Sequence, residues 1–181
     1  MAFGLLIGVG TATRISIAMG QGKRRIAECY LGQAVCVYLF LSFVVYPVCA
    51  WFAEPIVAAT GGTAATIPPA ADYLRIFFCG AIFQYFSFGL NHTLRAEGYP
   101  GKALTTMLIG ALANVVLDPF FIFDAVPLGF CTVPAFGLGI RGAAIATVLS
   151  QAISAVWVMA HFLRRGATLR LKLGYVKLYP A

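Results

Sequence analysis

An aspartate within an apolar stretch is the residue of this sequence whose chemistry most needs an explanation. Asp118 lies near the end of the apolar run 103–123. A carboxylate at the centre of a membrane-spanning helix costs on the order of 2.5 kcal/mol or more. Asn114 lies four residues earlier, so a helix places the amide and the carboxylate on one face, about one turn apart. Oxygen ligands in this arrangement suit Na⁺, or a carboxylate that exchanges protons.

Two plainer interpretations of this pair remain open. Asp118 directly precedes Pro119, so it can lie at the outer membrane interface, where a carboxylate costs less. The pair can also hydrogen-bond a neighbouring helix, because polar side chains hold membrane helices together in this way. We favour ion binding, because the shared helix face brings a second oxygen ligand to the carboxylate.

Three other polar residues are candidates for the same chemistry. Tyr73 and Asn91 lie at the start and in the second half of the apolar run 73–94, and Thr147 follows the small residues Gly-Ala-Ala-Ile-Ala. Each has a structural alternative, since the first two can bond a neighbouring helix and a threonine hydroxyl often bonds its own helix. All three are therefore weaker candidates than Asp118.

Catalytic and metal-binding patterns are missing from the sequence. It has no GxSxG, HExxH or phosphate-binding glycine loop. His92 and His161 are each isolated, and we expect both to lie unpaired at the membrane interface. The sequence thus predicts no enzyme, no cofactor and no metal site apart from possible Na⁺ at Asp118 and Asn114.

The composition of the chain predicts the membrane-spanning helices that position these residues. The chain is 61% hydrophobic and only 10% charged, which excludes an ordinary soluble domain. A membrane core about 30 Å thick needs about 20 apolar residues in a helix. Four runs meet this condition, and they cover residues 31–52, 73–94, 103–123 and 142–163.

A fifth apolar stretch, 2–13, ends at Arg14. A helix of this length measures about 18 Å, so we expect it to be only part of a span. The predicted fold is an all-α, multi-pass membrane bundle of about four complete transmembrane helices plus one partial helix. This fold places the chain in the cell membrane, in contact with lipid.

The basic residues predict the orientation of the bundle. If the spans alternate, eleven of the thirteen basic residues fall on one side, and only Arg75 and Arg141 fall on the other. Because positive loops stay inside, residues 20–28, 95–102 and the C-terminal tail are predicted to be cytoplasmic. The net charge of +7 is therefore a signal of topology, and no nucleic-acid partner is expected.

Several motifs together resemble one family of transporters. In order they read GVGTATRISIAMGQGKRRIAE, ADYLRI, LRAEGYPGKA, NVVLDPFFIF and GLGIRGAAIATVLSQ. From about Phe3 to Leu173, the chain resembles the multidrug and toxic compound extrusion (MATE) family, on the branch with DinF-like proteins. Members have twelve helices in two six-helix lobes, and they export cationic or aromatic compounds in exchange for Na⁺ or H⁺.

The resemblance implies roles for individual residues and segments. Residues 1–165 would be a partial amino-terminal lobe, with helices two to six, and residues 166–181 would be a cytoplasmic linker toward a missing second lobe. Helix one and its acidic residue have no counterpart. By the family pattern the cation site would comprise five residues, namely Asp118, Asn114, Thr147, Asn91 and Tyr73.

The expected function is therefore that of an ion-coupled drug antiporter in the intact protein, with the 181-residue chain truncated and inactive alone. The main alternative is a small membrane-embedded structural or assembly subunit, for which Asp118 and Asn114 would be dispensable. A channel would need a pore-lining polar ring that is not evident. The sequence does not identify the substrate, and it does not distinguish Na⁺ from H⁺ coupling.

Overall fold

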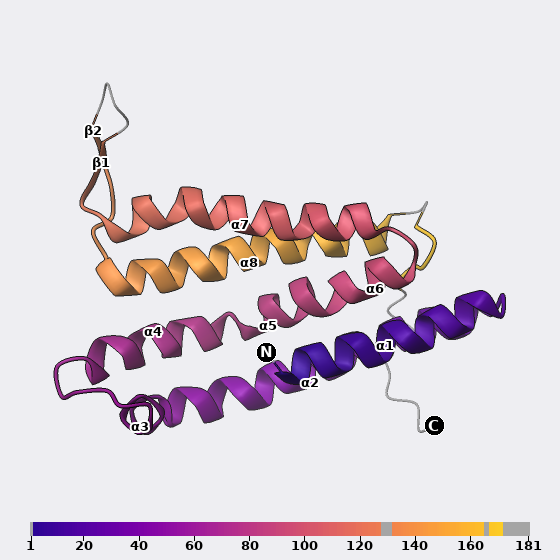
Figure 1. Cartoon of the computed structure of the whole chain (residues 1–181), viewed down its shortest axis with the longest axis horizontal. Coiled ribbons are helices and arrows are strands. Elements are labelled where there is room, and N and C mark those ends of the chain that lie inside the picture. Colours follow the sequence, from indigo (N-terminus) through magenta and orange to yellow (C-terminus); the bar gives the residue numbers. More distant parts are fainter. Residues whose placement is uncertain (1, 128–131, 165–166, 172–181) are drawn as a thin grey trace.

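The computed structural model describes residues 2–127, 132–164 and 167–171, and it is a helical bundle (Figure 1). The helices in chain order are α1 (Ala2–Gly20), α2 (Arg24–Trp51), α3 (Ala53–Ala59), α4 (Ile67–Cys79), α5 (Ala81–Gln84), the π-helix η1 (Tyr85–Gly89), α6 (Leu90–Ala96), α7 (Pro100–Ile122) and α8 (Gly139–Leu163). Two short strands, β1 (Ala125–Pro127) and β2 (Thr132–Pro134), form an antiparallel hairpin between α7 and α8. The predicted all-α membrane bundle is confirmed, with this hairpin as a small addition.

Four of the helices are long and apolar enough to cross a membrane by themselves, and they are α1, α2, α7 and α8. Three of these contain the predicted runs 31–52, 103–123 and 142–163 apart from a residue or so at their ends. The fourth predicted run, 73–94, is not one straight helix. It corresponds to the segment Ile67–Cys79 followed by Ala81–Ala96, which together form a span bent by 57°.

The first helix is longer than the sequence predicted. Arg14 does not end it, and α1 continues to Gly20, so that Phe3–Gly20 is long enough to span. The guanidinium of Arg14 lies over the ring of Tyr30, 5.8 Å from its centroid. A long basic side chain can cover apolar surface while its charge reaches toward water, so one arginine does not interrupt the helix.

The bend between α4 and α5 lies at Gly80. A side chain at this position would press into Val148 of α8, so glycine permits a close approach between the two helices. The two halves of the span then have different neighbours. α4 packs against α8, α3 and α2, whereas α6 packs against α1 and α7.

The loops gather at two opposite ends of the bundle (Figure 1). We call residues 51–67 and 122–139 the hairpin end, because they include the β-hairpin. We call residues 20–24, 96–100 and 163–171 the basic end, because most basic residues lie near it. The core between the ends is formed by buried side chains of α1, α2, α6 and α8, among them Ile15, Leu31, Tyr38, Leu90, Val158 and Phe162.

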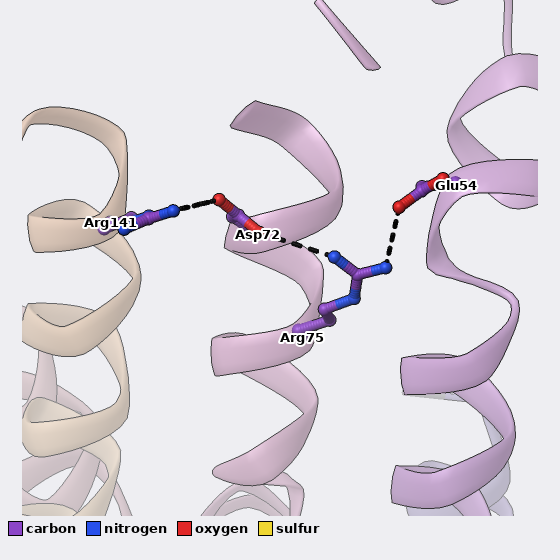
Figure 2. A network of polar contacts seen from close by, with 4 residues as sticks. All are labelled: Glu54, Asp72, Arg75 and Arg141. Atoms are coloured by element: carbon purple, nitrogen blue, oxygen red, sulfur yellow. Dashed lines mark hydrogen bonds and ion pairs between the residues drawn. The ribbon is translucent and has the colours of Figure 1, made fainter. Parts of the chain in front are cut away.

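A chain of ion pairs joins three helices near the hairpin end (Figure 2). Arg141 of α8 donates to Asp72 Oδ2 of α4 from Nη2 at 2.6 Å and from Nε at 3.1 Å. Arg75 of α4 bonds Asp72 Oδ1 at 3.4 Å and Glu54 Oε1 of α3 at 2.8 Å. The two basic residues that sequence analysis assigned to this side are therefore both paired with carboxylates.

Candidate functional site

The predicted pair on α7 is held by a direct hydrogen bond. Asn114 Nδ2 donates to Asp118 Oδ1 at 2.9 Å, and both residues are half-buried. This is the contact that their four-residue spacing predicts. Because the amide nitrogen faces the carboxylate, the amide oxygen of Asn114 is directed elsewhere.

Asn114 also lines a cavity of about 300 Å³ between three helical segments. The wall from α7 consists of Met107, Gly110, Ala111 and Asn114, and the wall from α8 consists of Thr147, Ser150, Gln151 and Ser154. Both sets follow the spacing i, i+3, i+4 and i+7, which is one face of a helix. The third wall is Ser87, Phe88 and Asn91, from η1 and α6. Each wall therefore includes polar residues, although most of the exposed lining is apolar, and none of these residues is charged.

The polar groups of the walls use their hydrogens on backbone carbonyls. Thr147 Oγ1 donates to Ala143 O at 2.8 Å, and Ser150 Oγ donates to Thr147 O at 2.8 Å. Ser154 Oγ donates to Thr106 O on α7 at 3.2 Å. A hydroxyl that has donated its hydrogen can offer only oxygen lone pairs to anything else.

The amides of the walls are arranged in the same sense. Asn91 Nδ2 donates to Ala103 O at 2.7 Å and is buried. Gln151 Oε1 is buried and has no hydrogen-bond partner within the described part of the chain. Together with the hydroxyls, these amides give a mostly apolar cavity several residues that carry acceptor oxygens. Such a site suits a cation or a ligand that carries hydrogen-bond donors.

The structure brings together three of the five predicted residues. Asn91, Asn114 and Thr147 line the cavity, and Asp118 is connected to it through its hydrogen bond to Asn114. Tyr73 is not among the lining residues. Its ring stacks on Phe77 of α4, with centroids 6.1 Å apart, on the other side of the bend from Asn91.

The purely structural roles considered for Asn91 and Thr147 are also present in the structure. Asn91 does bond a neighbouring helix, and Thr147 does bond its own helix. Neither bond removes the residue from the cavity, because each uses hydrogens and leaves oxygen lone pairs. The structural and functional interpretations are therefore compatible.

Sequence reasoning missed four polar lining residues, namely Ser87, Ser150, Gln151 and Ser154. For the last three a signal was present, because they share the helical face of Thr147. A glycine on α7 also lies at the contact between α7 and α8. A Cβ atom at Gly110 would collide with the hydroxyl of Ser154, so glycine allows α7 and α8 to approach closely.

Polar side chains gathered inside a bundle of apolar spans are typical of ion and substrate pathways in membrane proteins. The fold therefore defines a class, that of multi-pass helical membrane proteins. The MatE family model matches residues 1–120, and the chain belongs to this family, the MATE transporters. The predicted family is confirmed, while the matches do not distinguish its DinF-like branch.

Named relatives agree with this assignment. The chain is 30% identical over 178 residues to the multidrug export protein MepA of Staphylococcus haemolyticus and 27% identical over 177 residues to MepA of Staphylococcus aureus. It also resembles a structure of the inward-facing conformation of a multidrug resistance MATE family transporter, with a TM-score of 0.84 and 26% identity over 98% of the chain. The TM-score with an outward-facing conformation is 0.72.

The match covers only part of each relative. The chain spans 37% of the length of the MepA proteins and 38% of the inward-facing transporter. This share corresponds to part of one lobe of a two-lobed transporter. The structure thus describes one helical lobe and its cavity.

Proposed function

We propose that the complete protein is a secondary active antiporter that exports cationic or aromatic compounds in exchange for Na⁺ or H⁺. In this proposal the cavity with Asn91, Asn114 and Thr147, together with Asp118, holds the coupling ion. The observation that supports it is the cavity with polar residues in all three walls, which lies one hydrogen bond away from a carboxylate inside a span.

The Asn114–Asp118 bond suggests how an ion would be held. Na⁺ would be attracted to the Asp118 carboxylate and would take the amide oxygen of Asn114 as a second ligand, after this amide turns away from its present bond. A proton would neutralise the same carboxylate. Either ion would neutralise the negative charge of a half-buried carboxylate within a membrane-spanning helix, where a charge is costly.

Transport also requires a second moving part. In transporters of this kind, one bundle rocks against another around a central site, and the described residues form a single bundle. We propose that residues 1–181 alone do not carry out transport. If they act instead as a structural subunit, Asp118 and Asn114 will prove dispensable.

The decisive test is Asp118→Asn in a transporter that contains this lobe and a second lobe. We expect ion-driven efflux of a cationic dye to fall by at least tenfold at unchanged protein abundance, because the variant lacks the negative charge that would attract the ion. The matched control is Asp124→Asn, which alters an exposed carboxylate beyond the end of α7. Normal efflux by Asp118→Asn would contradict the proposal, as would an equal loss in the control.

Ion binding can be tested on the 181-residue chain itself. A ligand that binds only the folded state stabilises it in proportion to the logarithm of its concentration. If Na⁺ is the coupling ion, replacing K⁺ by Na⁺ should raise the melting temperature of the chain in detergent, and Asp118→Asn should remove this difference. An equal rise in the variant would exclude Asp118 as a ligand.

We also propose that the basic end faces the cytoplasm and the hairpin end faces outward in the cell membrane. The charge distribution of the loops supports this orientation. Single cysteines at Gln21 and Thr63, in a background without native cysteines, would report it through an impermeant thiol reagent added to intact cells. We expect labelling at Thr63 only, and the reverse pattern would overturn the orientation.

A further inference from the structure

The chain that leaves α8 lies against the basic end of the bundle. Ala167 and Leu169 are buried, and the side chain of Leu169 is 0% exposed. The backbone N–H of Leu171, which lies outside any helix or strand, donates to Phe162 O at the end of α8, at 3.2 Å. Leu169 belongs to the same hydrophobic core cluster as residues of α1, α2, α6 and α8. Residues 167–171 therefore contribute to the folded core.

A buried carboxylate meets this segment. Glu97 follows α6, and its side chain is 0% exposed. Its Oε1 accepts the backbone N–H of Leu169 at 2.8 Å, and its Oε2 bonds His161 Nε2 at 3.0 Å. Both carboxylate oxygens are thus used, one of them by the segment after α8.

His161 is itself held in place by a third residue. Lys102 Nζ lies 3.3 Å from His161 Nδ1. Because an ammonium group can only donate, Nδ1 accepts this bond and the Nε2–H donates to Glu97. The expectation that His161 is unpaired was therefore wrong, and the reason is that its partners come from distant parts of the sequence.

Two more contacts hold the same segment from other sides. Arg24 Nη2 of α2 donates to Ala167 O at 2.9 Å, and the hydroxyl groups of Tyr99 and Thr168 lie 3.1 Å apart. The segment is thus tied to α2, to the turn between α6 and α7, and to α8.

From these contacts we propose that residues 167–171 form a strap that is docked across the basic end, with Glu97 as its anchor. A carboxylate removed from water is tolerated only when its oxygens are hydrogen-bonded. The strap supplies one of the bonds that Glu97 needs, and Glu97 supplies the acceptor that the Leu169 N–H needs. The strap joins α2, α6 and α8 at this end so that they move as one body. These contacts lie within the lobe, and the strap does not depend on the proposed transport function.

Hydrogen–deuterium exchange of the 181-residue chain in detergent tests the strap. We expect the amides of Leu169 and Leu171 to exchange at least tenfold more slowly than those of an unstructured peptide. Glu97→Ala should accelerate both at least tenfold, while Glu97→Gln should keep Leu169 protected because its amide oxygen can accept the same N–H. The control Glu54→Ala, at the hairpin end, should change neither.

Unprotected amides in the wild type would overturn the proposal, and so would unchanged exchange in Glu97→Ala. If Glu97→Ala also exposes the amides of α7 and α8, the bundle itself has been disturbed. The variant Leu169→Ser then tests the strap separately, because it alters the strap and leaves Glu97 in place. We expect this variant to accelerate exchange at Leu171 with the helices still protected. Exchange at Leu171 that stays slow in Leu169→Ser would likewise overturn the proposal.

Discussion

The two ends of the bundle hold charged side chains in opposite ways. Near the hairpin end, four charged residues form a chain of ion pairs in which the side chains of Arg141 and Glu54 are 66% and 58% exposed. At the basic end, the carboxylate of Glu97 is fully buried and is bonded to a histidine and a backbone N–H. One end thus has a network in contact with solvent, and the other has a buried carboxylate held by hydrogen bonds.

The difference shows that counting ion pairs is a poor guide to which end is the more strongly fixed. Exposed ion pairs contribute little to stability, because water screens their attraction and two long side chains lose conformational freedom. A buried carboxylate is costly if either of its partners is removed. We therefore expect the basic end, which has the buried carboxylate of Glu97, to be more sensitive to substitution than the hairpin end.

The largest effect is expected for Glu97→Ala. The change leaves the Nε2–H of His161 and the backbone N–H of Leu169 without an acceptor, and each loss of this kind costs about 1–3 kcal/mol. Unfolding of the chain in detergent, followed by tryptophan fluorescence, measures it. Glu54→Ala is the matched change at the hairpin end and should have no measurable effect. Equal destabilisation by the two variants would remove the distinction between the ends.

A smaller effect is expected from pH. Burial raises the pKa of the Glu97 carboxyl above its usual value of 4.5, although the hydrogen bonds from His161 and the Leu169 backbone N–H and the charge of Lys102 oppose this rise. The folded state then holds the proton more tightly than the unfolded state. The stabilisation is complete below pH 4.5 and is lost as the pH rises through the raised pKa.

This dependence is measured by comparing melting temperatures across pH. Glu97→Gln resembles the protonated carboxyl and cannot ionise, so its curve should lack the fall that the wild type shows. All other carboxylates are common to both proteins and cancel in the difference. Parallel curves for the wild type and the variant would show that Glu97 does not titrate in this range.

The smallest effect is expected for Asp72→Asn, which breaks the contacts of Asp72 with Arg75 and Arg141. The melting temperature should fall slightly at low ionic strength. In 1 M KCl the wild type and the variant should converge, because the screening length drops from about 10 Å at 0.1 M to about 3 Å. A salt-independent loss would show that this network behaves like the buried anchor.

Most of the fold could be predicted from the lengths of the apolar runs. In a membrane the backbone must satisfy its own hydrogen bonds, so an apolar run of sufficient length becomes a helix. This reasoning located α2, α7 and α8. It failed at Arg14, because a single arginine can reach water from within a helix, and at Gly80, because glycine is common in membrane helices and its effect depends on contact with Val148.

Only the part of the site that lies within one helix turn could be predicted from the residues alone. Asn114 and Asp118 are one turn apart, so their contact follows from the sequence, whereas Asn91 and Thr147 were weaker candidates that only the family resemblance assigned to the same site. Tyr73 and Asn91 are separated by about five helical turns in a straight helix, which would place them on one face. The bend at Gly80 and the π-helix between them remove that relation. The Glu97 anchor was not predictable, because its partners His161 and Leu169 are 64 and 72 residues away in the sequence.

The number of residues in the π-helix η1 determines whether Asn91 lies in the cavity wall. A π turn accommodates one more residue than an α turn. Deleting one residue within Tyr85–Gly89 would restore α-helical spacing and rotate α6 by about 100° relative to α5. Asn91 would then leave the cavity wall with its side chain unaltered. During evolution, a single codon gained or lost in these five positions would change the site as much as a substitution of the amide itself.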